Sequence, residues 1–206
     1  PHTPLQVPEK YYNMYKDLNP ELGFSDDLSD FRMNEKDKED ARKIYGMVTN
    51  IDDNVGKVIN KLKELKIEEE TIIIFMTDNG PQQIRYNSSM KGRKGTVYNG
   101  GIRVPFYIQY SEKFKESKVI NKMSAHIDVL PTILELCNLN VPNDRKIDGQ
   151  SLVPFINSKS TNDRFLFSYW TRRFPEKYIN MSIQNDNYKL VGNNDFDSKI
   201  EEFELY

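Results

Sequence analysis

The sequence predicts an α/β fold, and three segments carry that prediction. From Asn34 onward, apolar residues recur at three- and four-residue steps, the spacing of one helical face. They are Ala41, Ile44, Tyr45, Val48, Ile51, Val55, Val58, Leu62 and Leu65. Two apolar runs follow, at residues 71–76 and 104–110. The first is continuous rather than alternating, which is typical of a strand covered on both faces in a parallel or mixed sheet. A long helix followed by buried strands indicates α/β architecture.

The ends of the long helix are also marked in the sequence. Asn34 or Asp37 can cap its first turn, where acidic residues favour the positive end of the helix dipole. Lysines gather toward its C-terminal end. We therefore expect one uninterrupted helix from about residue 34 to the acidic connection at residues 68–70.

Smaller elements are predicted from residue 127 to the end of the chain. A second helix is expected at residues 127–139, with Pro131 in its first turn, and a short helical piece at 152–156. Short apolar runs separated by Asn, Asp and Gly turns then predict strands at 165–170, 178–184, 188–191 and 202–206. The predicted organisation is an α/β domain at residues 1–160 and a small antiparallel β subdomain at 161–206.

Composition excludes several classes of function. The 29 basic and 31 acidic residues give a net charge of −2, so no global field favours nucleic acid. No apolar run approaches the roughly 18–20 residues of a membrane span. The single cysteine, Cys137, excludes an internal disulfide, and its helical spacing from Ile133 and Leu134 predicts a small buried thiol. The chain begins with Pro1, and we expect it to be a fragment of a longer protein, so it gives no localisation signal.

Asp78 and Asn79 directly follow the first predicted strand, in the sequence T-D-N-G-P. Their side chains are hard oxygen donors, which suit Ca²⁺ or Mg²⁺ better than zinc or copper. Calcium takes about six to eight oxygens, so these two residues make only part of a site. The alternative is an ordinary Asn-Gly turn that ends a strand.

Lys94 lies between Gly92 and Gly95 in a loop that also carries Lys91 and Arg93. Glycine lets the backbone approach a ligand closely, and an ammonium can neutralise a tetrahedral oxyanion as a compact charge. The spacing does not match a P-loop. The alternative is a solvated basic loop.

His2 and His126 are the only imidazoles, so any acid–base role of histidine falls on one of them. His2 lies in a proline-bearing segment that can hold its side chain in one direction. His126 stands where the second helix begins, which favours a capping or packing role. The order and spacing of residues indicate neither a Ser-His-Asp nor a Cys-His arrangement.

Taken together, these segments resemble the sulfatase family of the alkaline-phosphatase-like superfamily. The motifs in the family's order are P-H-T-P, then M-T-D-N-G-P with R-Y-N and K-G-R-K-G-T-V-Y-N-G-G-I-R-V-P, then H-I-D-V-L-P-T-I-L-E-L, I-D-G-Q-S-L-V-P-F-I, Y-K-L-V and E-L-Y. The resemblance implies part of a mixed sheet flanked by helices, and hydrolysis of a sulfate ester of a glycan or small aryl group. It implies that Asp78 and Asn79 bind calcium and that Lys94 and His2 contact the sulfate or its leaving group.

The chain departs from the family in one respect. The family's nucleophile is a formylglycine made in a C/S-x-P-x-R motif, which this chain lacks and which is expected upstream. An Asp pair that completes the calcium site also lies upstream in the family. We therefore expect a C-terminal portion that is inactive alone and whose partner is the N-terminal half of the same protein. The alternatives are a phosphoester or phosphonate hydrolase of the same superfamily, or a non-catalytic anion-binding α/β module.

Overall fold

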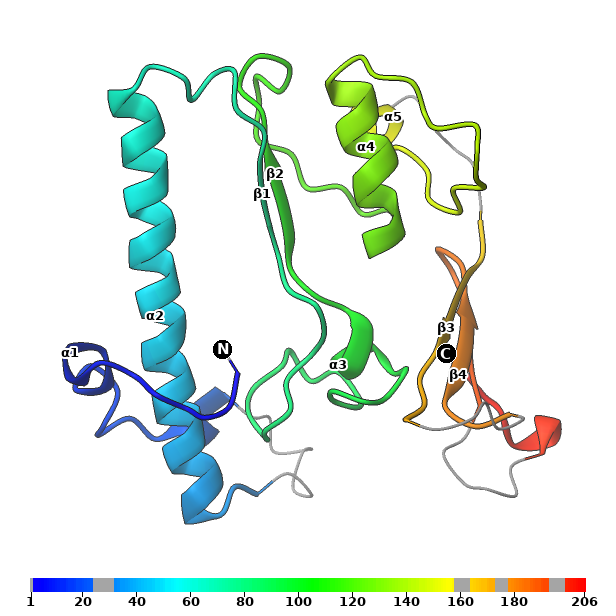
Figure 1. The fold of residues 1–206 in the computed structure, drawn as a ribbon. Helices are drawn as coiled ribbons and strands as arrows, with labels where there is room; N and C mark the ends of the chain where they lie inside the picture. The colour runs from blue at the N-terminus through cyan, green and yellow to red at the C-terminus, as the bar shows by residue number, and fades with distance from the viewer. Residues whose placement is uncertain (1, 24–31, 158–163, 173–177, 193–198) are drawn as a thin grey trace. The chain divides into compact units, whose positions relative to one another are not determined.

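The computed structural model describes residues 2–23, 32–157, 164–172, 178–192 and 199–206. The chain divides into two compact units, which we call unit 1 (residues 1–115) and unit 2 (residues 116–206), and each is described by itself (Figure 1). The described elements are helices and strands in antiparallel sheets, which agrees with the predicted combination of helices and sheets in an α/β fold. The domain boundary expected at residue 160 lies outside the described residues and stays a prediction.

The long predicted helix of unit 1 is confirmed as α2, Glu35–Glu64 (Figure 1). Asn34 caps it through a capping box: its side chain accepts from the Asp37 amide at 2.9 Å, and the Asp37 carboxylate accepts from the Asn34 amide at 3.3 Å. The two bonds satisfy amides that the first helical turn leaves without partners inside the helix.

The N-terminal segment packs against α2 through α1, Glu9–Tyr12, and the short helix η1, Pro20–Gly23. The Tyr11 hydroxyl donates to Asp53 at 2.7 Å. Ala41 and Ile44 of α2 are buried. A Cβ on Gly46 would lie 3.0 Å from the Tyr11 carbonyl, so the glycine allows this close approach.

The rest of the apolar face of α2 stays exposed in the described chain. Val48 is 49% exposed, Val58 59% and Leu65 56%. The three- and four-residue spacing therefore identified the face correctly, but in the described residues only its N-terminal part is covered.

The two predicted strands of unit 1 are β1, Ile73–Met76, and β2, Phe106–Gln109, and they pair antiparallel. Ile73 lies opposite Gln109, and Met76 opposite Phe106. A mixed sheet admits such a pair, but the expected cover on both faces is absent in the described residues: Phe75 and Met76 are 36% and 40% exposed. A continuous apolar run indicates a strand suited to burial and says nothing about what covers it.

Unit 2 begins with η3, His126–Asp128, which continues into α4, Val129–Leu136, and is followed by α5, Val153–Ile156. The C-terminal antiparallel sheet has the order β3-β4-β5-β6. Its strands are β3, Leu166–Tyr169, β4, Met181–Gln184, β5, Lys189–Val191, and β6, Glu204–Leu205, with the short helix η4, Ile200–Glu202, before the last. None of the described helices has the length and apolar character needed to cross a bilayer.

The prediction for Cys137 is wrong, because its side chain is exposed. Helix α4 ends at Leu136, and Cys137 is its C-cap residue. Leu136 is 2% exposed and occupies the buried position at the end of this helix. The helix stops one residue before the expected thiol position, so helical spacing no longer applies there.

Candidate active site

The turn after β1 presents two oxygen donors. Asp78 is exposed and Asn79 is half-buried. The Asn79 amide donates to Asp78 Oδ1 at 2.9 Å, and Asn79 Nδ2 donates to the Gly80 carbonyl at 2.9 Å. Among the described residues, nothing donates to Asp78 Oδ2 or Asn79 Oδ1. The turn therefore leaves one carboxylate oxygen and one amide oxygen available to a ligand.

These oxygens fit calcium in type but not in number. Carboxylate and amide oxygens are ligands that calcium accepts, and a complete site has about six to eight of them. In the part of the chain that the structure describes, no group of three or more His, Cys, Asp or Glu side chains could hold a metal ion. The two oxygens would make only part of a calcium site, and the role of Asp78 and Asn79 as ligands stays a prediction.

Lys94 occupies the second position of a β-turn formed by residues 93–96. The Thr96 amide donates to the Arg93 carbonyl at 3.0 Å, and Gly95 in the third position has a φ of 87°, the left-handed conformation that a type II turn requires there. The Lys94 amide donates to the Pro81 carbonyl at 2.8 Å. This bond joins the basic loop to the Asp78–Pro81 turn.

A second backbone contact joins the same segments through α3, Asn99–Ile102. The Gly80 amide donates to the Gly101 carbonyl at 2.8 Å. A Cβ on Gly80 would lie 1.8 Å from the Gly100 carbonyl oxygen, and a Cβ on Gly100 would lie 2.1 Å from the Gly92 carbonyl oxygen. Only glycine permits these approaches. The sequence showed that the loop is glycine-rich, but not that its glycines lie against one another.

The cations of the basic loop differ in their surroundings. The Lys91 ammonium lies 4.5 Å from the centre of the ring of Tyr98, and Tyr98 is buried. Lys94 is half-buried. Arg85, in the R-Y-N motif, faces Tyr45 of α2, and burial lowers the pKa of Arg85 while burial raises the pKa of Tyr45. The loop thus carries positive charge close to the Asp78–Pro81 turn.

His2 is exposed, and its Nδ1 lies 2.7 Å from the Thr3 carbonyl oxygen. A carbonyl oxygen only accepts, so Nδ1 carries the hydrogen and Nε2 is the nitrogen left for another group. No hydrogen bond or ion pair of the described residues joins His2 to Asp78, Asn79 or Lys94. The structure brings the other three residues into adjoining turns and leaves the role of His2 a prediction.

Unit 2 contains a charged site that the sequence did not reveal. The Asp128 carboxylate is fully buried. It accepts from the amides of Ala125 at 2.7 Å and Gln150 at 2.9 Å, from Arg164 Nη1 at 2.8 Å, and also from Arg164 Nη2. Asp128 therefore caps this helical start, and the exposed His126 precedes it by two residues. Asp128 belongs to the H-I-D motif and Gln150 to the I-D-G-Q motif, but nothing in the spacing of the two motifs indicated that these residues meet.

Thr132 extends this network to the segment before α5. Its hydroxyl donates to the Asp128 carbonyl at 2.6 Å and accepts from the Leu152 amide at 2.9 Å. A Cβ on Gly149 would lie 1.9 Å from the Ile127 carbonyl oxygen. The network binds α4 to residues 149–152. Both Asp128 carboxylate oxygens and the Thr132 hydroxyl bond within the protein, so their role is to hold unit 2 together.

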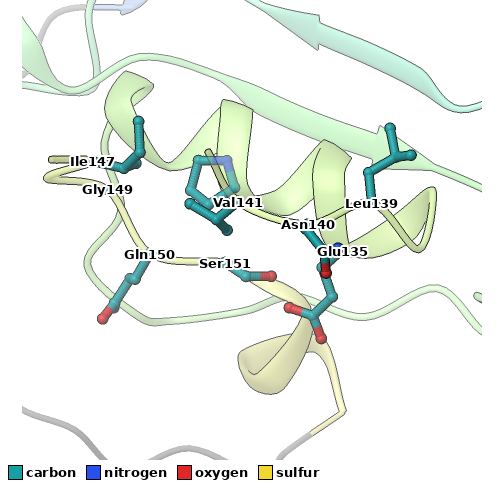
Figure 2. A pocket seen from close by; sticks show the side chains of 9 residues that line it. Glu135, Leu139, Asn140, Val141, Ile147, Gly149, Gln150 and Ser151 are labelled. Atoms are coloured by element: carbon teal, nitrogen blue, oxygen red, sulfur yellow. The ribbon is translucent and has the colours of Figure 1, made fainter. Parts of the chain in front are cut away.

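Figure 2 shows a pocket of about 470 Å³ beside α4 in unit 2. The Glu135 side chain reaches into it from the helix, and Ser151 faces it from the segment that follows Gly149 (Figure 2). Its lining residues are Pro131, Glu135, Leu139, Asn140, Val141, Ile147, Gly149, Gln150 and Ser151. None of the predicted site residues is among them.

Comparison with known families now identifies the class of protein. The chain matches the Sulfatase family over residues 1–139 and the family "N-sulphoglucosamine sulphohydrolase, C-terminal" over residues 93–206. The chain therefore belongs to the sulfatase family, as the order of its motifs predicted.

Individual relatives agree with this membership. The chain is 32% identical over 139 residues to the steryl-sulfatase of Homo sapiens, covering 61% of this chain and 24% of that protein. It is 30% identical over 183 residues to an arylsulfatase of Clostridium perfringens, covering 80% of this chain and 37% of that protein. The chain thus spans about a quarter to a third of the length of these relatives.

Solved structures show the same fold. The putative sulfatase yidJ from Bacteroides fragilis superimposes with a TM-score of 0.79 at 23% identity, over all of this chain and 45% of that one. The phosphonate monoester hydrolase of Agrobacterium radiobacter superimposes with a TM-score of 0.67 at 19% identity, over all of this chain and 48% of that one. At these identities the likeness establishes the alkaline-phosphatase-like fold.

Proposed function

We propose that this chain is the C-terminal portion of a sulfuric ester hydrolase and carries part of its calcium and sulfate site. The observation that carries the proposal is the hydrogen bond from the Lys94 amide to the Pro81 carbonyl, at 2.8 Å. It joins a turn with two available oxygen donors to a loop with an ammonium group. A cation-binding turn beside a fixed lysine suits a substrate whose reacting group is a tetrahedral anion.

Each residue has a definite role in this proposal. Asp78 and Asn79 hold calcium together with ligands from outside this sequence, and bound calcium supplies positive charge for the sulfate oxygens. The Lys94 ammonium stabilises the negative charge that develops on the leaving oxygen. His2 turns Nε2 toward the sulfate or the leaving group and, when protonated, delivers a proton to the leaving alkoxide.

The formylglycine nucleophile lies outside this sequence in our proposal. The relatives named above are about three to four times as long as the segment matched, which leaves room for a nucleophile segment elsewhere in the protein. The substrate is a sulfate ester of a glycan or a small aryl group. The 206-residue chain by itself is then expected to leave an aryl sulfate intact even with calcium present.

A phosphonate or phosphoester hydrolase is the second candidate, and the superposition on the phosphonate monoester hydrolase favours it. Phosphate and sulfate groups have a similar size and shape, so Lys94 and a calcium turn suit either. The sulfatase reading is preferred because the matching families and the curated relatives carry sulfatase names.

The experiment compares substrates that differ only in the reacting group. The full-length protein, expressed with the enzyme that generates formylglycine, is assayed with 4-nitrophenyl sulfate, 4-nitrophenyl phosphate and 4-nitrophenyl phenylphosphonate. We expect the highest kcat/KM with the sulfate and loss of activity on calcium chelation. A preference for the phosphonate would select the second candidate, and tight anion binding without turnover would indicate a non-catalytic module.

A further inference from the structure

The hydroxyl of Thr96 closes the turn that carries Lys94. It donates to the Arg93 carbonyl at 2.8 Å and accepts from the Arg93 amide at 3.2 Å. The Thr96 amide donates to the same carbonyl at 3.0 Å. Three hydrogen bonds therefore connect the two ends of this four-residue turn. Two of these bonds require the Thr96 hydroxyl.

The surroundings of this hydroxyl leave it little freedom. A Cβ on Gly92 would lie 2.5 Å from Thr96 Oγ1, and a Cβ on Gly101 would lie 2.8 Å from it. The absence of a side chain at both glycines thus makes room for the hydroxyl. Val97, the next residue, is 1% exposed and fixes the chain just beyond the turn.

Hydrogen bonds fix the backbone at Lys94 and around it. Its own amide bonds to Pro81, and the turn around it is closed by Thr96. A lysine side chain has a long, rotatable stem, so the fixed backbone limits where the ammonium can reach. Misplacement of a catalytic group by about 1 Å can lower the rate by about a hundredfold.

We propose that Thr96 is a positioning residue for Lys94: its hydroxyl closes the 93–96 turn and thereby directs the lysine ammonium to the sulfate group. The inference rests on the proposed function. It assigns Thr96 no contact with the substrate, because its hydroxyl already donates to one backbone group and accepts from another.

The test uses the full-length enzyme and replaces the hydroxyl while keeping the shape of the side chain. Thr96→Val removes both hydroxyl bonds, and Thr96→Ser restores them. Thr49→Val is the matched control, because Thr49 in α2 also bonds through its hydroxyl, to Tyr15 at 2.7 Å and to the Tyr45 carbonyl at 3.2 Å. For 4-nitrophenyl sulfate we expect kcat/KM to fall about tenfold in Thr96→Val. Thr96→Ser should keep most of the activity, and Thr49→Val should stay within about twofold of wild type.

Two further readouts separate positioning from general damage. In a Lys94→Ala background, adding Thr96→Val should change kcat/KM by less than about twofold, because the hydroxyl acts through Lys94. The loss in Thr96→Val should also be larger for phenyl sulfate, which has a poorer leaving group, than for 4-nitrophenyl sulfate. If Thr96→Val does not fold, as judged by its melting temperature, Thr96→Ala takes its place in both comparisons.

The outcomes distinguish this inference from the proposed function. An inactive wild-type enzyme would overturn both. An active wild type with an unimpaired Thr96→Val variant would overturn the inference alone. The same holds if Thr96→Val lowers activity equally with and without Lys94, because the threonine would then act independently of the lysine.

Discussion

Asp78 in unit 1 and Asp128 in unit 2 show how differently one fold uses the same side chain. Asp78 is exposed, and its carboxylate accepts a hydrogen bond from the adjacent Asn79 amide. Asp128 is fully buried, and its two oxygens accept from Ala125, Gln150 and both terminal nitrogens of Arg164. A carboxylate whose acceptor positions the protein already fills has none left for a metal. One with unused oxygens at a strand end is available to a ligand.

The two surrounding regions differ in the same way. In unit 1, backbone hydrogen bonds and glycine contacts hold the Asp78–Pro81 turn against the Lys94 loop, which leaves polar side chains available. In unit 2, side chains themselves form the network, and the Asp128 carboxylate and the Thr132 hydroxyl use their polar atoms in hydrogen bonds within the protein. The exposed Asp78 carboxylate is therefore available to a ligand, whereas the buried Asp128 carboxylate is not.

The largest effect is expected from Asp128→Ala. The change leaves the Arg164 guanidinium, whose side chain is 16% exposed, without the carboxylate that it contacts. Removing one partner of a buried ion pair costs about 3–5 kcal/mol. Urea unfolding of the intact protein measures the loss. Asp144→Ala is the control, since Asp144 pairs with Arg145 at the surface. Equal stability of the two variants would refute the structural role of Asp128.

Lys94→Ala tests the other half of the comparison. Loss of a group that stabilises developing charge lowers kcat by about 10²–10³-fold, and the free energy of unfolding should change little. Steady-state kinetics of the full-length enzyme with an aryl sulfate measures the effect. Lys91→Ala is the matched control in the same loop, because the Lys91 ammonium lies over the Tyr98 ring. A similar loss in both variants would mean that the loop acts only through its total charge.

Lys189 provides a pH-dependent test within the sheet of unit 2. It is 7% exposed, and burial lowers its pKa from 10.5 to about 8. The folded state holds the Lys189 proton less tightly than the unfolded state. The buried charge therefore has its full destabilising effect below pH 8, and the free energy of unfolding rises as the pH increases from 8 to 10.5. Lys189→Met should therefore stabilise the protein by up to about 3 kcal/mol at pH 7.

The advantage of Lys189→Met should shrink as the pH rises toward 10.5. Denaturant unfolding of both proteins at several pH values measures this difference. Lys118→Met, at an exposed position of unit 2, should leave both stability and its pH dependence close to wild type. A constant difference between wild type and Lys189→Met across the range would show that burial does not shift the lysine pKa.

The smallest change in stability is expected from Asp78→Asn, within about 0.5 kcal/mol, as for an ordinary surface substitution. The same variant should bind calcium at least tenfold more weakly in the full-length protein, because a ligand charge is lost. Calorimetric titration measures the affinity, and urea unfolding of the calcium-free protein measures the stability. A marked loss of stability without calcium would make Asp78 a structural residue like Asp128.

Some features followed from residues close together in the chain. Helix α2 begins at the predicted cap because Asn34 and Asp37 are three residues apart and satisfy each other's amides. The strand positions followed from apolar runs, and the antiparallel C-terminal sheet from its turn residues. The side-chain chemistry of Asp78, Asn79 and Lys94 left an ordinary turn and a solvated loop open as alternatives. The order of their motifs among the others indicated the family that the comparisons established.

Other features depend on residues far apart in the chain. The sequence alone determined that a capped helix, two apolar strands and a set of oxygen and ammonium groups exist, since each is a local property. The tertiary structure decided that β1 and β2 pair antiparallel, that Cys137 is exposed and that Asp128 is buried against Arg164. It also decided that Lys94 lies against Pro81. The reason is physical: burial and hydrogen bonding depend on which distant backbone reaches a residue, and no local pattern encodes that partner.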